Sequence, residues 1–170
     1  EVKNKKVDVM TSRGDKYLGG KDFDKEITKL MKKKYFDALK VDIDIEDNKK
    51  YIQKAEEIKK ILSVKNKASI SVNGPKGPQQ IEITQEEFEE SIQTYIEKIK
   101  MLIEEAMEAS GMKPSRINQT LLVGGSTRMR IVSQSYSYRA DFHFTSIVSV
   151  SNLIICYVNY NAMMRWISLL

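Results

Sequence analysis

The chain has 170 residues, a formal net charge of +5 at pH 7, one cysteine and one histidine. This length suits one large domain or two small ones. The single cysteine, Cys156, excludes an intrachain disulfide and fits a reducing compartment, so we expect a cytoplasmic protein. Together with His143 it cannot form a metal cluster without several carboxylates. The modest charge allows nucleic-acid binding without requiring it.

The N-terminal part is predicted to hold a hairpin and then a helix. Residues 1–11 alternate in polarity around a polar turn, as in a β-hairpin. A double glycine, Gly19-Gly20, precedes an acidic helix start, where Asp22 or Asp24 would complement the positive end of the helix. The apolar residues of this helix recur with a 3.6-residue period as far as about residue 40: Phe23, Ile27, Leu30, Met31 and Ala38.

A second helix with two faces is predicted over residues 49–63. Its apolar stripe consists of Tyr51, Ala55, Ile58 and Leu62. A polar set at spacings of three, four and seven falls on the other side: Glu56, Lys59, Lys60 and Ser63. From composition alone, the simplest interpretation of this set is a solvated face with local ion pairs.

A hairpin and a long helix are predicted next. Residues 68–72 and 81–83 alternate in polarity around an extended loop at 73–78. Thr84 and Glu87 have the spacing of a capping box, which opens a long helix that ends at Gly111. The core side of this helix is predicted to be Phe88, Ile92, Tyr95, Ile99, Leu102 and Ala106.

A buried strand that runs into a glycine turn is predicted at residues 120–128. The apolar run 121–123 is typical of a strand buried on both faces. Gly124-Gly125 would let a ligand approach the backbone closely, Ser126-Thr127 could cap a following helix, and Arg128 could stack on a ring or bind an anion. Taken alone, this stretch is more simply a tight turn without a ligand.

The last part of the chain has a different composition. Residues 133–170 contain only three charges, at Arg139, Asp141 and Arg165. The uncharged run 144–164 is long enough to span a bilayer, but its asparagines and serines make a poor membrane helix. We therefore expect a β-prone tail without a packing complement, and unpaired edges on the strand at 120–123.

Three motifs carry a resemblance to a known family. They are Gly14-Asp-Lys-Tyr-Leu-Gly-Gly-Lys-Asp-Phe-Asp24, Glu56-Glu-Ile-Lys-Lys-Ile-Leu-Ser63 and Leu122-Val-Gly-Gly-Ser-Thr-Arg128. In this order and spacing they resemble the second lobe of the nucleotide-binding domain of the heat-shock 70-kilodalton (DnaK-type) chaperones. The family binds ATP with magnesium between two lobes and couples its hydrolysis to a separate peptide-binding domain.

The resemblance implies a fold and a domain organisation. Residues 1–132 would form part of an α/β, actin-like nucleotide-binding domain with an incomplete sheet. Within it, residues 22–114 would form an α+β helix–hairpin–helix subdomain. Residues 133–170 would be a divergent apolar tail of unknown fold.

The resemblance also implies a set of nucleotide contacts. The polar stripe at 56–63 would contact the ribose and adenine, and the turn at 124–128 would hold the adenine. The implied nucleotide-binding residues are Gly20, Glu56, Lys59, Lys60, Ser63, Gly124, Gly125, Ser126 and Arg128. ATP or ADP is the expected cofactor, with Mg²⁺ in the intact family, and no catalytic residue or metal ligand is implied in this chain. A glutamate can accept hydrogen bonds from ribose hydroxyls, and lysine stems can lie along a base.

Several departures from the family pattern limit this expectation. The Asp-Leu-Gly-Thr phosphate loop, the phosphate-contacting lysine and the first lobe are not in the sequence. Tyr17 stands where the family usually has histidine, and Lys21 where it has an acid. The chain starts at Glu1 without a methionine or a visible signal peptide, and after Val132 the usual continuation is replaced. We therefore expect a fragment that is inactive as an ATPase.

Two functions remain open. The first is a fragment of an ATP-dependent chaperone that supplies the adenosine side of the cleft and faces an exchange factor. Its partners would be an adenine nucleotide, a nucleotide-exchange factor or co-chaperone, and an unfolded client only through a separate peptide-binding domain. The second is a non-catalytic protein-interaction module derived from such a chaperone. A third and weaker alternative, a small basic nucleic-acid binder, is not expected because the Lys/Glu helices are balanced in charge. Binding to a membrane is not expected because the apolar run is a poor spanning segment.

Overall fold

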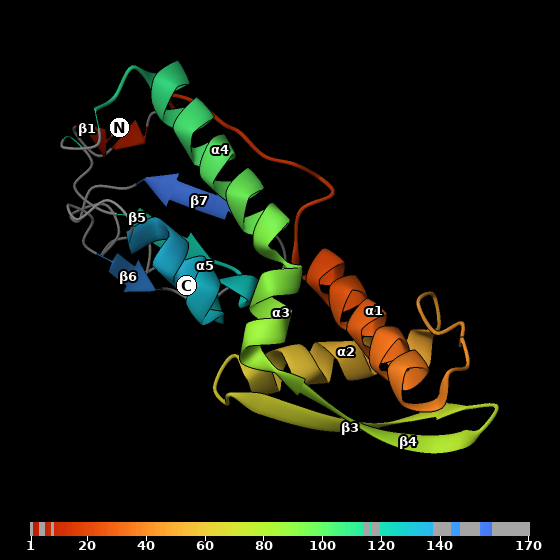
Figure 1. Cartoon of the computed structure of the whole chain (residues 1–170). Helices are drawn as coiled ribbons and strands as arrows, with labels where there is room; N and C mark the ends of the chain where they lie inside the picture. Colours follow the sequence, from red (N-terminus) through yellow and green to blue (C-terminus); the bar gives the residue numbers. More distant parts are fainter. Residues whose placement is uncertain are drawn as a thin grey trace. The chain divides into compact units, whose positions relative to one another are not determined.

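The computed structural model describes residues 2–3, 6–7, 9–113, 116, 120–137, 144–146 and 154–157. Its contacts divide the chain into two compact units (Figure 1). One unit combines Glu1–Lys16 with Ile96–Leu170, and the other is Tyr17–Tyr95. The second of these units holds the two-faced helix predicted from sequence, and the first holds the glycine turn.

Helix α1 (Gly20–Leu39) opens the unit 17–95. Its buried apolar residues are Phe23, Ile27, Met31 and Tyr35. The prediction that Ala38 belongs to this stripe is wrong, because the buried positions recur every four residues and Tyr35 takes the next place. The helix ends at Lys40 in the left-handed conformation, with φ +53°, where its N–H donates to the Phe36 carbonyl at 2.7 Å.

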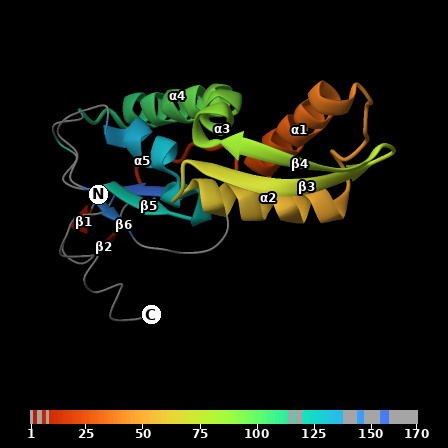
Figure 2. The same ribbon diagram turned by 60° about the horizontal axis from the view of Figure 1, so that its bottom comes forward.

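A β-hairpin follows helix α2 (Lys49–Leu62) and contacts both helices (Figure 2). Strands β3 (Lys67–Gly74) and β4 (Gly77–Thr84) pair antiparallel up to Gly74 and Gly77. The predicted hairpin is confirmed, but the predicted extended loop is wrong: only Pro75 and Lys76 lie outside the ladder. One face of the hairpin is buried, through Ala68, Ile70, Val72, Ile81 and Ile83.

Two tyrosines fix the far end of the hairpin to the helices. The Tyr35 hydroxyl of α1 donates to the Gly77 carbonyl at 3.2 Å. The Tyr51 hydroxyl of α2 donates to the Asn73 carbonyl at 3.2 Å and accepts from the Asn73 N–H at 3.0 Å. The Tyr35 ring also lies directly over Gly74: a Cβ atom at this glycine would lie 2.5 Å from the Tyr35 Cζ and hydroxyl atoms. Only a residue without a side chain fits here.

Gly74→Ala should therefore destabilise the protein by about 1–3 kcal/mol, the usual cost of overpacking a core. The added methyl group would displace Tyr35, and it would also lie 2.8 Å from Ile43 Cγ2. Gly14→Ala is the matched control, because a Cβ at Gly14 has no atom within 4 Å. Urea unfolding of both variants measures the difference. Equal midpoints for the two would contradict the packing of Tyr35 on Gly74.

The predicted long helix is two helices, α3 (Gln85–Ser91) and α4 (Gln93–Ser110). The capping box is confirmed: Thr84 Oγ1 accepts from the Glu87 N–H at 3.2 Å, and Glu87 Oε2 accepts from the Thr84 N–H at 2.9 Å. The prediction of one continuous helix is wrong, because Ile92 adopts φ −103° and ψ 4°. The predicted end is confirmed, and Gly111 has φ +64°.

The other unit contains short strands. Strands β1 (Val2–Lys3) and β2 (Lys6–Val7) form the predicted N-terminal hairpin. A three-stranded sheet has the order β6-β5-β7, with β5 (Thr120–Val123) parallel to β6 (Phe144–Ser146) and antiparallel to β7 (Ile154–Tyr157). The prediction that β5 has unpaired edges is therefore wrong. Segments of the tail pair with its exposed N–H and C=O groups, as β-prone chain does with an open strand edge.

The remaining predictions for the tail have no further structural test. Of the uncharged run 144–164, only strands β6 and β7 lie within the described residues. Among the helices in the described part of the chain, none is long and apolar enough to cross a bilayer. The assignment of residues 22–114 as a subdomain and of 133–170 as a divergent tail stays a prediction.

Candidate functional site

The polar side of α2 is the first part of the candidate site. The helix begins after Asn48, whose side chain accepts from the Lys50 N–H at 3.0 Å. Its predicted apolar stripe is confirmed, since Tyr51, Ala55, Ile58 and Leu62 are all buried. This stripe turns one face of the helix toward the core. The polar residues that alternate with these apolar positions therefore differ in how far they are exposed to solvent.

Lys59 is the inward-facing member of the polar set. Its ammonium lies 2.7 Å from Asp24 Oδ1 and donates to the Gly20 carbonyl at 2.9 Å. The two side chains are only 13% and 7% exposed. Lys59 is the ionic partner of Asp24 Oδ1, a buried oxygen that accepts no hydrogen bond of good geometry within the described residues. Lys59 thus joins α2 to the start of α1, and the interpretation of the whole set as a solvated face is wrong for this residue.

The role of Asp24 is not evident from the sequence alone. The pattern offers Asp22 and Asp24 as equivalent acids at a helix start, whereas in the structure Asp22 lies in the first turn and Asp24 is buried. A signal was present in the spacing: Asp24 stands four residues before Thr28, which is also buried, and so borders the apolar stripe of α1. An acid at such a position requires a cation, which Lys59 supplies.

Burial raises the pKa of Asp24 above that of an ordinary carboxyl group, while the Lys59 ammonium beside it lowers the pKa by a smaller amount. The folded chain therefore holds a proton on Asp24 at pH values where the unfolded chain has released it. The resulting contribution to stability is full below the ordinary carboxyl pKa and is lost as the pH rises through the raised value.

Glu56 and Lys60 form the outward-facing part of the set. The Glu56 carboxylate and Lys60 ammonium are 2.8 Å apart, and the side chains are 50% and 69% exposed. The hydrogen bond and charge of Lys60 lower the pKa of Glu56, and Glu56 raises the pKa of Lys60 in return. Ser63 is half-buried at the end of α2, where its hydroxyl donates to the Lys59 carbonyl at 3.0 Å. An acceptor, the Glu56 carboxylate, and a donor, the Lys60 ammonium, are thus exposed on adjacent turns of α2.

Two alanine substitutions separate the inward from the outward lysine. Lys59→Ala should destabilise the protein by about 3 kcal/mol, because it leaves the Asp24 carboxylate buried without a partner. Lys60→Ala should change stability little, since its ion pair with Glu56 is solvated. Chemical denaturation of the two variants side by side is the measurement. A similar loss in both would show that Lys59 is not the buried partner of Asp24.

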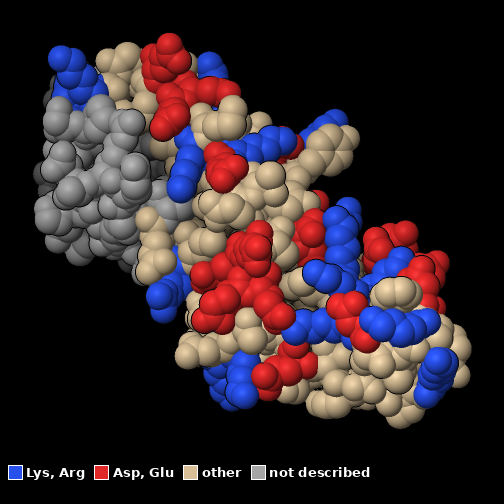
Figure 3. All heavy atoms as spheres, in the orientation of Figure 1, with Lys and Arg blue, Asp and Glu red and all other residues tan. Residues whose placement is uncertain are grey.

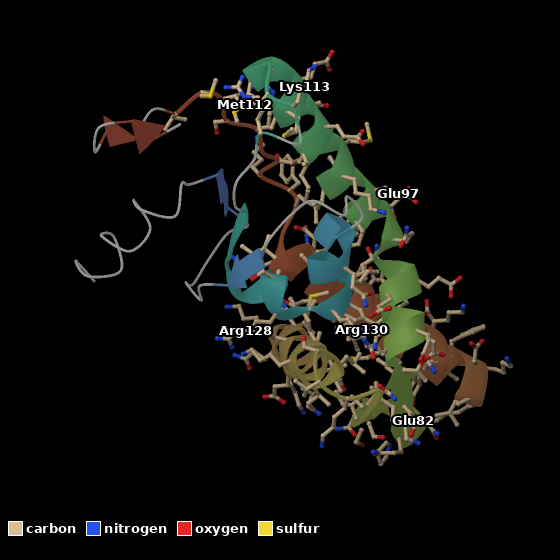
Figure 4. All side chains as sticks on the ribbon, turned by 90° about the vertical axis from the view of Figure 1, so that its left-hand side faces the viewer. Glu82, Glu97, Met112, Lys113, Arg128 and Arg130 are labelled. Atoms are coloured by element: carbon tan, nitrogen blue, oxygen red, sulfur yellow. The ribbon has the colours of Figure 1, made fainter. Side chains whose placement is uncertain are left out.

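The glycine turn holds the other residues predicted to contact the nucleotide and belongs to the other unit. Gly124 is buried and has φ +111°, a conformation that favours glycine. It is followed by a 3-10 helix, η2 (Gly125–Arg128), and by α5 (Arg130–Ser137). Gly125 and Arg128 are exposed, and Figure 4 shows Arg128 in this segment.

The predicted capping role of Ser126 and Thr127 is wrong. Both lie inside η2, and the Thr127 hydroxyl donates back to the Gly124 carbonyl at 2.7 Å. The Ser126 carbonyl accepts from the Met129 N–H at 3.2 Å. Short hydroxyl side chains often bond to nearby backbone in this way, which here closes the turn on itself. Ser126 is half-buried.

The structure therefore brings Gly20, Lys59, Glu56, Lys60 and Ser63 together on the unit 17–95, with Gly124, Gly125, Ser126 and Arg128 in a separate turn. Within the described residues, no group of His, Cys, Asp and Glu could hold a metal ion. Basic and acidic side chains are interspersed on the face drawn in Figure 3.

The fold and the site define an α+β protein in which a two-helix layer and an antiparallel hairpin carry a polar helix face. The family model described as "Hsp70 protein" matches residues 1–139. The chain therefore belongs to the Hsp70 family, whose members have the actin-like ATPase fold.

Curated relatives agree with this membership. The chain is 33% identical over 143 residues to "Chaperone protein dnaK" of Thalassiosira pseudonana, covering 79% of the chain and 24% of the relative. It is 33% identical over 141 residues to "Chaperone protein dnaK1" of Prochlorococcus marinus, covering 78% and 21%. It is 31% identical over 164 residues to "Mitochondrial-type heat shock protein 70" of Encephalitozoon cuniculi, covering 89% and 28%. The chain spans about a quarter of the length of these relatives.

Proposed function

We propose that this chain supplies the adenosine-binding side of an ATP site in an Hsp70-type chaperone. The observation that carries the proposal is the arrangement on α2, where Glu56 and Lys60 are exposed one turn apart beside the anchored Lys59. A carboxylate can accept hydrogen bonds from the two ribose hydroxyls, and the lysine stem can lie along the base. The relatives named as chaperones support the assignment to a chaperone.

The glycine turn supplies a second set of contacts in this proposal. Gly125 is exposed and carries no side chain, so a flat ring can approach the backbone there, while the buried Gly124 shapes the turn. A Cβ atom at Gly125 would have no atom within 4 Å, so the space beside it is open. The exposed Arg128 guanidinium can stack on an aromatic base. Ser126 contributes a hydroxyl group at the same turn.

Hydrolysis is not part of the proposed function. Phosphoryl transfer needs a cradle for the β- and γ-phosphates, a positioned water and a metal ion with its ligands. The candidate residues address the base and the ribose, and the described part of the chain has no metal-binding group of acidic, His and Cys residues. We therefore assign no step to the Mg²⁺ of the intact family.

The proposal predicts weak binding of adenosine and ATP with similar affinity, because the contacts are to the nucleoside. Lys60→Ala and Arg128→Ala should each weaken both ligands by about tenfold, the effect of one charge-assisted contact. Lys65→Ala is the matched control, since Lys65 is an exposed lysine just beyond α2. Calorimetric titration gives the affinities.

A phosphate-release assay on the same preparation should read background. Turnover that survives removal of contaminating full-length chaperone would contradict the proposal. Absence of any adenosine binding would also contradict it.

A second candidate function is a non-catalytic interaction module. The outer face of the β3–β4 hairpin favours it, because its exposed side chains are polar and available to a partner: Lys67, Ser69, Ser71, Gln80 and Glu82. In an intact chaperone this unit would face a nucleotide-exchange factor or co-chaperone. Partner binding without nucleotide binding would favour the second function.

A cytoplasmic location stays a prediction.

A further inference from the structure

The buried ion pair of Asp24 and Lys59 lies beside the proposed nucleoside contacts, and Asp24 is not one of those contacts. Asp24 lies in α1 and contributes no atom to the exposed face of α2, yet it is 2.7 Å from the Lys59 ammonium. The charged groups that act on Asp24 are Lys59, Glu56 and Lys60, all from α2. Two acids and two lysines thus form one cluster without net charge.

We propose that Asp24 sets the ligand preference of this site: by neutralising and fixing the Lys59 ammonium, it keeps the polar side of α2 from favouring phosphate groups, so that adenosine and its phosphates bind alike. The inference rests on the proposed function. A lysine near a nucleotide is commonly a point charge that attracts phosphate. Here the charge is compensated by Asp24, and the ammonium is held by the Gly20 carbonyl at 2.9 Å.

Fixing Lys59 also prepares it for binding. A free lysine side chain loses rotamer freedom when a ligand orders it, and this loss weakens binding. Lys59 is 13% exposed and already ordered by its two contacts. The exposed Lys60 has only the solvated pair with Glu56. Asp24 is therefore a positioning residue, which acts through Lys59 and touches no ligand itself.

The test compares adenosine with ADP as probes of the full chain. Asp24→Asn keeps the side-chain shape but gives the cluster a net positive charge, so the affinity ratio should shift toward ADP by about two- to tenfold at low salt. The shift should shrink at high salt. The double variant Asp24→Asn with Lys59→Gln makes the cluster neutral again and should restore the ratio of the unmodified chain.

Asp22→Asn is the matched control. It removes an acid from the same turn of α1, but Asp22 pairs with Lys25 at 4.0 Å and not with Lys59. It should change the ratio less than Asp24→Asn does. An unchanged ratio in Asp24→Asn, an equal shift in Asp22→Asn, or a shift that persists in the neutral double variant would overturn the proposal.

A second measurement needs no variant. Brief reductive dimethylation of the chain, read by peptide mass spectrometry, should modify Lys60 several-fold faster than Lys59, and equal rates would overturn the proposal. The two levels of inference fail differently. If neither adenosine nor ADP binds, the proposed function fails and the specificity fails with it. If both bind and the ratio does not respond to Asp24→Asn, only the specificity fails.

Discussion

The contact of the Lys59 ammonium with Asp24 and the Gly20 carbonyl is the constraint on which the candidate site depends. Apolar packing presses α1, α2 and the hairpin together, but it tolerates small rotations of a helix about its axis. A buried charge does not, because its partner must stay within ionic contact. Lys59 therefore sets the rotation of α2 and joins it to the first turn of α1. Glu56 and Lys60, on adjacent turns, are exposed as a consequence.

This constraint divides a sequence motif that looks uniform into parts with different tasks. Lys59 and Lys60 are neighbours of the same residue type, yet one is anchored in the protein and the other is solvated. In the proposed site, Glu56 and Lys60 contact the ligand. Lys59, whose charge is compensated by Asp24, holds a fixed position beside them. In the other unit, the glycine turn exposes the backbone of Gly125, with Gly124 in a conformation that favours glycine. In the proposed function, the contacts of both parts are to the nucleoside.

Local patterns predicted much of this structure, and features set by distant contacts were missed. The stripe of α2, the β3–β4 hairpin and the Thr84–Glu87 cap depend on residues within a few positions of one another, so periodicity was sufficient. The break at Ile92 carries no glycine or proline, and its buried side chain looks like any other core residue. The partners of β5 come from a part of the chain with no strand signal strong enough to assign a pairing. Asp24 was missed because its partner lies on another helix.

The central claim is that the polar side of α2 and the glycine turn bind the nucleoside. Its most direct test is a two-dimensional amide NMR titration of the isotopically labelled chain with ADP. The account predicts that the largest shift changes fall on the amides of residues 56–63 and 124–128, and that adenosine shifts the same amides. Shift changes concentrated on the β3–β4 hairpin, or none at saturating ADP, would contradict it.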